Sequence, residues 1–102
     1  MNRAEPASVT RDGERLRIAG ALDRASATAL WPALERQAAG AAVLDLTGVV
    51  RLDSAGLALL AELAARLRQQ GPLRIDGDPD GLADLRAAYR LGDTLDYVAN
   101  TP

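Results

Sequence analysis

The chain has 102 residues, of which 48% are apolar and 25% charged, with a formal net charge of −2, and this is typical of one ordinary soluble domain. Cysteine and histidine are both absent, which excludes disulfides, thiolate nucleophiles, Ser-His-Asp catalysis and ordinary zinc sites. There is no basic cluster, no glycine-rich phosphate loop and no apolar run of about 18 residues, so the sequence lacks the signatures of nucleic-acid binding, nucleotide binding and membrane insertion.

The first part of the chain is predicted to form a β-hairpin. Residues 1–7 are polar and include Pro6, so we expect a flexible lead-in. Two short strands are predicted at residues 9–11 and 16–18. Asp12-Gly13 between them favours a type I′ turn, in which both central residues have positive φ. Gly20 is expected to close the second strand.

The next element is predicted to be an amphipathic helix. Leu30, Leu34 and Ala38 recur at four-residue spacing, with polar residues between them. Pro32 is compatible only with the first turn of a regular helix. The helix is therefore expected to begin near Leu30 or to be kinked there, and to end at Gly40.

An apolar run at residues 42–46 is predicted to be a central parallel strand, because such strands are buried on both faces. A loop is expected at residues 47–53, and then a second helix that ends at Gly71-Pro72. We expect Leu44, Leu57 and Leu60 to be core residues. The full apolar face of the second helix is expected to contain Leu57, Leu59, Leu60, Leu63, Ala64 and Leu67.

The last third of the chain is predicted to contain a strand at residues 73–75, a turn at 78–81 and a helix with Leu82, Leu85 and Tyr89 that ends at Gly92. Leu95 and Val98 are expected to pack as a closing segment. The order β-β-α-β-α-β-α predicts an α/β fold, with a mixed four-stranded sheet and helices packed against it. Residues 1–102 are expected to form a single domain.

The segment at residues 45–57 is the most unusual part of the sequence. A buried strand leads into a helix that opens with Asp53 and Ser54, and both residue types accept hydrogen bonds from the free N–H groups of a first helical turn. Gly56 permits the close approach of backbone or of a partner. Ser54 lies where the helix dipole favours added negative charge, such as a phosphate. The simpler alternative is that Asp53 or Ser54 only caps the helix.

Residues 44–57, Leu-Asp-Leu-Thr-Gly-Val-Val-Arg-Leu-Asp-Ser-Ala-Gly-Leu, resemble the signature of STAS domains, the family of anti-sigma factor antagonists. The Gly-Ala-Leu-Asp sequence at 20–23 resembles an earlier element of that family, which follows its second strand. The resemblance covers nearly the whole chain and implies the STAS fold. It also implies that Ser54 is the functional hydroxyl, which is phosphorylated in sigma-regulating members. Ala55 stands where the family often has Ser or Gly.

Residues 30–35 and 57–60, together with Gln70-Gly71, resemble one subgroup, the STAS subunits of Mla-type ABC transporters. This resemblance implies a non-enzymatic cytoplasmic subunit that lies at the inner membrane through its complex with a permease. Such a subunit binds the MlaF-like ATPase of a transporter that moves phospholipids to maintain outer-membrane asymmetry. It implies no cofactor, metal, nucleic acid or direct membrane insertion. The alternative is an anti-sigma factor antagonist regulated by phosphorylation of Ser54. A small enzyme is a third hypothesis, for which no suitable base is present.

The second helix also shows a physical basis for binding. Ser54, Ala58, Ala61 and Ala65 are spaced four, three and four residues apart, so they form one stripe. Small side chains let another backbone approach closely, and Glu62, Arg66 and Gln69 are placed to form a polar rim. The alternative is an alanine-rich helix selected for helix propensity. The candidate partner-binding residues are Asp53, Ser54, Ala55, Gly56, Ala58, Ala61, Glu62 and Ala65.

Three further features have two interpretations each. Asp23 either contributes to the surface near Ser54 or caps the helix that follows it. Trp31 is either half-buried packing or an interface anchor. The alternating carboxylates Asp76, Asp78 and Asp80 are predicted to be an acidic turn, because a calcium loop needs further ligands and a late Glu.

Overall fold

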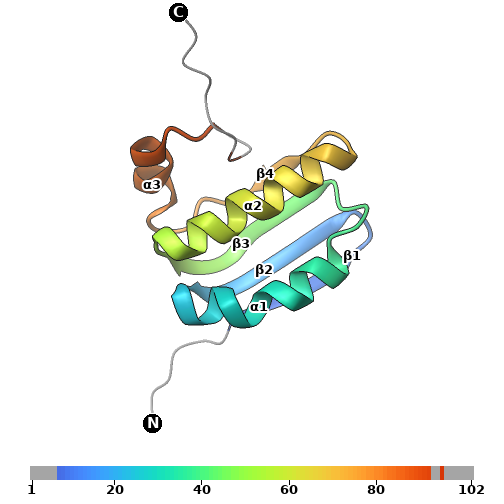
Figure 1. Ribbon diagram of the computed structural model, residues 1–102, viewed down its shortest axis with the longest axis horizontal. Helices are drawn as coiled ribbons and strands as arrows, with labels where there is room; N and C mark the ends of the chain where they lie inside the picture. Colours follow the sequence, from blue (N-terminus) through green and yellow to red (C-terminus); the bar gives the residue numbers. More distant parts are fainter. Residues whose placement is uncertain (1–6, 93–94, 96–102) are drawn as a thin grey trace, which may run out of the picture.

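The computed structural model describes residues 7–92 and Leu95. Its elements are β1 (Ser8–Asp12), β2 (Arg15–Leu22), α1 (Arg24–Gln37), β3 (Val43–Leu52), α2 (Ser54–Gln70), β4 (Arg74–Asp76) and α3 (Leu82–Tyr89), shown in Figure 1. The four strands form one sheet in the order β1-β2-β3-β4. β1 and β2 are antiparallel, whereas β2–β3 and β3–β4 are parallel. The predicted α/β architecture with a mixed four-stranded sheet is confirmed.

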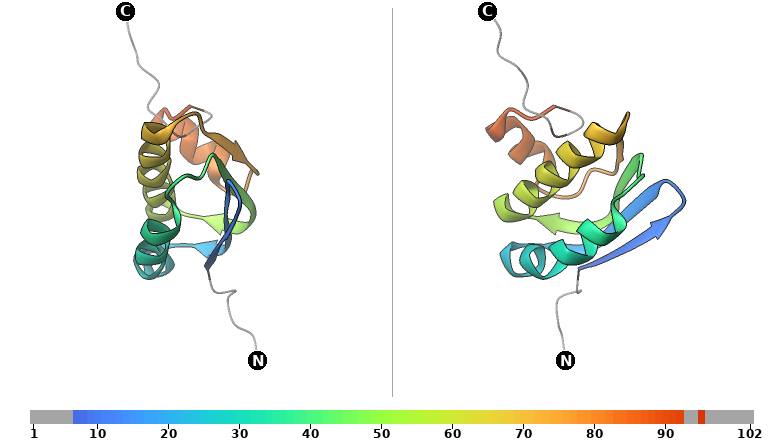
Figure 2. Two further views of the ribbon diagram at one scale, coloured as in Figure 1. Left: turned by 90° about the vertical axis from the view of Figure 1, so that its right-hand side faces the viewer. Right: turned by 45° about the vertical axis from the view of Figure 1, so that its right-hand side comes forward.

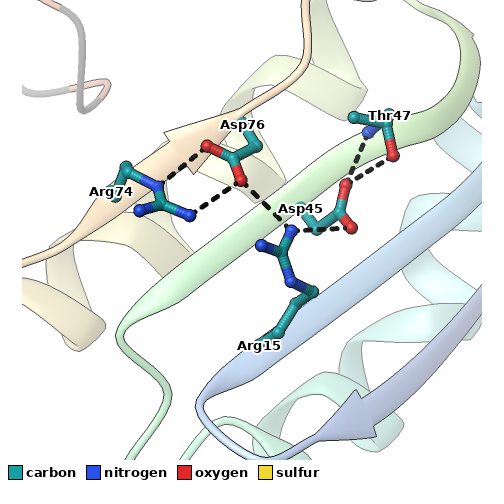
Figure 3. A network of polar contacts seen from close by, with 5 residues as sticks. All are labelled: Arg15, Asp45, Thr47, Arg74 and Asp76. Carbon is teal, nitrogen blue, oxygen red and sulfur yellow. Dashed lines mark hydrogen bonds and ion pairs between the residues drawn. The ribbon is translucent and has the colours of Figure 1, made fainter.

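The helices α1 and α2 lie side by side on one face of the sheet, as both views of Figure 2 show. Leu44 and Leu46 of β3 are fully buried on that face, because alternate residues of a strand point to opposite sides. The predicted core residues Leu44, Leu57 and Leu60 are 0%, 3% and 0% exposed. The opposite face carries Asp45 between these leucines, and its polar network with Arg15 and Asp76 is shown in Figure 3.

The hairpin is formed as predicted, but its turn is different. Asp12 pairs with Arg15, so the two central residues are Gly13 and Glu14 rather than Asp12 and Gly13. Gly13 has φ +60°, and Glu14 is not among the residues with positive φ. A type I′ turn needs positive φ at both positions, so the prediction of that type was wrong. Positive φ at the first position alone is the pattern of a type II′ turn.

The strands β2 and β3 are longer than predicted. Gly20 does not close β2; with φ +93° it lies at a register irregularity, after which the strand continues to Leu22. The predicted loop after residue 46 is also wrong, because β3 extends to Leu52. Beyond the irregularity Leu22 pairs with Leu52. The parallel neighbour supplies hydrogen-bond partners to a segment whose composition alone indicates no strand.

The helix α1 begins well before the predicted start, since Arg24 rather than Leu30 is its first residue. Asp23 caps it, and Ala27, Leu30 and Leu34 are buried against the sheet. Pro32 lies inside the helix, so the prediction of a start near Leu30 was wrong. Capping and burial on both sides of the proline compensate for the backbone hydrogen bond that it removes.

The C-terminal elements lie close to their predicted positions. α2 ends at Gln70 with Gly71 as its C-cap, and β4 follows within one residue of the prediction. α3 ends at Tyr89 and not at Gly92, and its C-cap Arg90 adopts the left-handed conformation with φ 58°. Leu95 is buried as expected, whereas Val98 lies outside the described residues. Of the expected lead-in at residues 1–7 only Ala7 is described, and it is half-buried.

None of the helices in this described part of the chain is long and apolar enough to cross a membrane.

Candidate partner-binding surface

The starts of α1 and α2 lie at the same edge of the sheet. β2 and β3 run parallel, and each leads directly into a helix, so both helices begin at the carboxyl ends of neighbouring strands. The Asp53 N–H donates to the Leu22 carbonyl at 3.1 Å, which holds the start of α2 against the end of β2. Asp23 and Arg24 follow Leu22 directly. Two helix starts that are far apart in sequence therefore contribute to one surface.

Both helix starts are capped by aspartates. Asp53 Oδ1 accepts from the Gly56 N–H at 3.0 Å, so Asp53 rather than Ser54 caps α2. Asp23 Oδ1 accepts from the Ser26 N–H at 3.0 Å, and Ser26 Oγ accepts from the Asp23 N–H at 2.9 Å. Hydrogen bonds from the Ser26 backbone and side chain lower the pKa of Asp23 below its ordinary value. Of its two interpretations, Asp23 therefore fulfils the capping role.

Gly56 is buried and faces β2 rather than the surface of the helix. A Cβ atom at this position would lie 2.4 Å from the Leu22 carbonyl oxygen and 2.9 Å from Leu22 Cβ. Only glycine permits this close approach of α2 to β2. Gly56 thus holds the start of α2, and with it Ser54, close to β2.

The stripe predicted on α2 is formed. Ser54 and Ala58 are exposed, and Ala61 and Ala65 are half-buried. No hydrogen bond joins Ser54 Oγ to another residue within 7–92 and 95. A shallow, open groove of about 390 Å³ runs over the contact between α1 and α2, and a second of about 290 Å³ lies between α2 and α3. The stripe of small residues is therefore a low ridge between two hollows, mostly lined by apolar side chains.

The groove between α1 and α2 is bordered by Trp31, which is half-buried and packs against the core. The Arg66 guanidinium lies 4.9 Å from the centre of its ring. Arg66 also pairs with Glu35 at 3.0 Å and with Glu62 at 3.3 Å. Trp31 thus packs as expected, and it also lines the groove, where it is held by a cation–π contact.

Residues 7–98 match the family described as "Mlab, STAS domain". The chain belongs to the STAS-domain family. It is similar to the intermembrane phospholipid transport system binding proteins MlaB of Escherichia coli K12 and Shigella flexneri, each 33% identical over 89 residues that cover 86% of this chain and 92% of the relative. A solved structure, "Crystal Structure Analysis of Mglu", is 32% identical with a TM-score of 0.51 over 72% of this chain, and the match spans 20% of that structure's chain.

The STAS domain also presents residues on this surface that the sequence did not indicate. Arg24 lines both grooves, and Tyr89 and Leu91 form the far wall of the second. The order of strands and helices contained a signal for Arg24, because parallel strands bring successive helix starts to one edge. No local pattern identifies Tyr89, because its position depends on how α3 packs against α2.

The three alternating aspartates near the end of the STAS domain do not lie in one turn. Asp76 lies in β4, where it contacts Arg15 and Arg74, while Asp78 and Asp80 are exposed after the strand. Asp80 forms an isolated bridge with Arg51. Within residues 7–92 and 95, no three carboxylates come together in a way that could hold a metal ion.

Proposed function

We propose that this STAS domain is a subunit of an Mla-type ABC transporter that moves phospholipids, and that it binds the transporter's ATPase subunit through the surface at the start of α2. The similarity to the MlaB proteins supports the assignment to this class of transporter. Under this proposal residues 1–102 act as one binding module in the cytoplasm, held at the inner membrane by the complex, with no catalytic role.

The observation that carries the proposal is the ridge of small residues with a groove on either side. Ala58 is exposed where most helix surfaces carry long polar side chains, and Ala61 lies on the same ridge. A helix of the partner can approach such a ridge closely and place its larger side chains in the two grooves. Packing of this kind buries apolar surface without the loss of side-chain freedom that long residues impose.

The supporting residues keep this surface rigid. The Asp53 cap and the close contact at Gly56 hold the first turn of α2 on β2. Glu62 is held by Arg66, so that one side of the ridge has a polar border. A surface that is already ordered loses less conformational entropy on binding, which favours affinity.

One observation favours a second candidate function, that of an anti-sigma factor antagonist. Because Asp53 caps α2, the Ser54 hydroxyl is exposed and does not serve as the cap. A phosphate on Ser54 would lie at the positive end of the helix dipole. In this second candidate a kinase would modify Ser54 and release the partner.

Binding to the ATPase subunit tests the first proposal. We expect Ala58→Arg and Ala61→Arg to abolish co-purification with the ATPase, because a long charged side chain covers the ridge and must be desolvated in the contact. Ala29→Arg on the exposed side of α1 is the matched control and should co-purify fully. Thermal melts of Ala58→Arg and Ala29→Arg, both at exposed positions, should lie near that of the wild type. Normal melts together with full co-purification of Ala58→Arg and Ala61→Arg would show that this ridge is not the interface.

Ser54→Asp separates the two candidate functions. In a kinase-switched antagonist the carboxylate imitates phosphate and releases an anti-sigma partner. In a transporter subunit it weakens ATPase binding only through local charge and crowding. The measurement is co-purification of Ser54→Asp with the ATPase and, separately, with an anti-sigma partner. Loss of binding to the anti-sigma partner alone would favour the antagonist.

A further inference from the structure

Arg24 lies at the point where the two grooves meet. It lines both of them, together with Ala55 and Ala58. Its side chain is exposed, and it forms no ion pair with any residue in the described ranges 7–92 and 95. The charged head is thus free to meet a group from outside the chain, next to an apolar floor.

The carboxylates of α1 and α2 and of their caps all have other partners. Glu35 and Glu62 both pair with Arg66. Asp23 and Asp53 accept backbone N–H groups as the caps of α1 and α2. These four acidic groups therefore leave the charge of Arg24 without a direct counterpart.

The position of Arg24 is also unfavourable for its own helix. It is the first residue of α1, directly after the Asp23 cap. The N-terminus of a helix carries a partial positive charge, which stabilises acidic residues there and repels basic ones. The stability of α1 therefore does not explain an arginine here, and residues that reduce stability are typical of functional surfaces.

We propose that Arg24 is the ionic anchor of the partner-binding surface and receives the carboxylate of an Asp or Glu from the docking segment of the ATPase. A guanidinium binds a carboxylate through two parallel hydrogen bonds, which fixes the orientation of the partner as well as its position. The residues beside the carboxylate pack on Ala55 and Ala58. This inference rests on the proposed function, because it names the chemistry of the same partner.

A protein carboxylate fits the site better than a lipid headgroup or free phosphate. Besides Arg24, the polar side chains that line the second groove are those of Ser54 and Tyr89, and neither is cationic. The remaining lining consists of alanine and leucine side chains, which suit the apolar residues of a docking helix.

The test compares affinities of the full-length chain for the purified ATPase subunit at low and high salt. We expect Arg24→Glu to weaken binding about tenfold or more at low salt and to bind better as salt rises, opposite to the wild type, because repulsion replaces attraction at this contact and salt screens it. Arg24→Lys keeps the charge without the two-pronged geometry and should bind with intermediate affinity. Arg36→Glu, at the other end of α1, is the control and should bind like the wild type.

The same variants exclude a folding defect. Arg24→Glu places a carboxylate at the helix N-terminus, so its melting temperature should equal or exceed that of the wild type. Weaker binding by a protein that is at least as stable therefore reports on the contact itself. Arg36→Glu removes a favourable cation from the last turn of α1 and should melt slightly lower.

The outcomes distinguish a failure of the Arg24 anchor from a failure of the proposed binding surface on α2. Full affinity of Arg24→Glu would overturn the anchor, even if Ala58→Arg fails to bind and the proposed surface stands. Loss of binding by Arg24→Glu with normal binding by Ala58→Arg would keep the ion pair of Arg24 but overturn the packing on Ala58 and, with it, the proposed surface. If the wild type does not bind the ATPase, both proposals fail.

Vesicles of phosphatidylglycerol test the lipid alternative directly. We expect the wild type and Arg24→Glu to bind these vesicles equally weakly, because a single arginine provides little attraction to an anionic surface. Binding of the wild type but not of Arg24→Glu, with unchanged affinity of the variant for the ATPase, would assign Arg24 to a phosphate group and overturn the carboxylate.

Discussion

Asp45 and Asp76 are paired on the parallel strands β3 and β4, and the Arg15 guanidinium connects their carboxylates (Figure 3). Arg15 Nη1 donates to Asp45 Oδ2 at 3.0 Å and to Asp76 Oδ2 at 3.1 Å. Arg74 donates to both oxygens of Asp76 from the same strand, and Thr47 donates to Asp45 Oδ1 from its N–H and its hydroxyl. Like charges opposite each other destabilise a sheet. The positive charge of Arg15 offsets this repulsion, and its two hydrogen bonds connect β2 with β3 and β4.

The first prediction concerns acid stability. Burial acts to raise the pKa of Asp45, but hydrogen bonds from Thr47 and Arg15 outweigh it, so that its pKa is lowered. Arg74 and Arg15 lower the pKa of Asp76. A carboxylate with a lowered folded-state pKa stabilises the protein above its unfolded pKa of about 3.9, and this stability is lost as pH falls through the folded-state value. The free energy of unfolding in urea should therefore fall progressively as the pH is lowered below about 5.

Asp45→Asn identifies the source of this acid sensitivity. At pH 7 the variant should be less stable than the wild type by about 1–3 kcal/mol, because charge-assisted hydrogen bonds to a buried group are lost. Its stability should fall less steeply in acid, so that the two curves converge as the native carboxyl takes up its proton. Curves that remain parallel over this range would place the acid sensitivity elsewhere.

The second prediction concerns the contact between α2 and β2. Replacing a helical glycine by alanine ordinarily stabilises a helix by about 1 kcal/mol. At Gly56 the added Cβ would lie 2.4 Å from the Leu22 carbonyl oxygen, so the helix start must shift. We expect Gly56→Ala to destabilise the protein by about 1–3 kcal/mol in urea melts, which is the usual cost of overpacking. A stabilised Gly56→Ala variant would contradict this geometry.

The third prediction concerns the core. Leu60 is completely buried between α2 and the sheet. Leu60→Ala should cost about 2–5 kcal/mol, since it removes apolar contacts and leaves a cavity. Val50 is 50% exposed on β3, so Val50→Ala should change stability by only about 0.5 kcal/mol. Equal effects of the two substitutions in denaturant melts would show that the buried face of α2 has been misplaced.

The fourth prediction separates Asp53 from Ser54. Asp53→Ala removes the hydrogen bond to the Gly56 N–H and should cost about 1 kcal/mol of stability. Ser54→Ala removes an exposed hydroxyl that does not cap the helix and should change stability by less than about 0.5 kcal/mol. Thermal melts and urea titrations of both variants measure the difference. If Ser54→Ala were the more damaging substitution, Ser54 would have to contribute to the cap.

The local chemistry of the chain was sufficient for the order of the elements and for the end, the start and the buried face of α2. Gly71 and Pro72 mark the end of α2 because one permits a positive φ and the other cannot continue a helix. The apolar spacing around Leu57 and Leu60 identified the buried face of that helix. Asp53 and Ser54 marked its start, although the sequence did not show which of them is the cap. In each case the deciding interactions lie within about one helical turn.

The tertiary structure decided whatever depends on neighbours distant in sequence. The second half of β3 is a strand because β2 lies beside it, and α1 includes Pro32 because the sheet buries Leu30 and Leu34 on either side. Arg24 lines the same grooves as Ala58 only because two parallel strands lead into their helices at one edge. Asp45 and Asp76 become partners only through pairing across strands. Strand pairing and burial are long-range interactions, so they override local preferences that a single sequence displays.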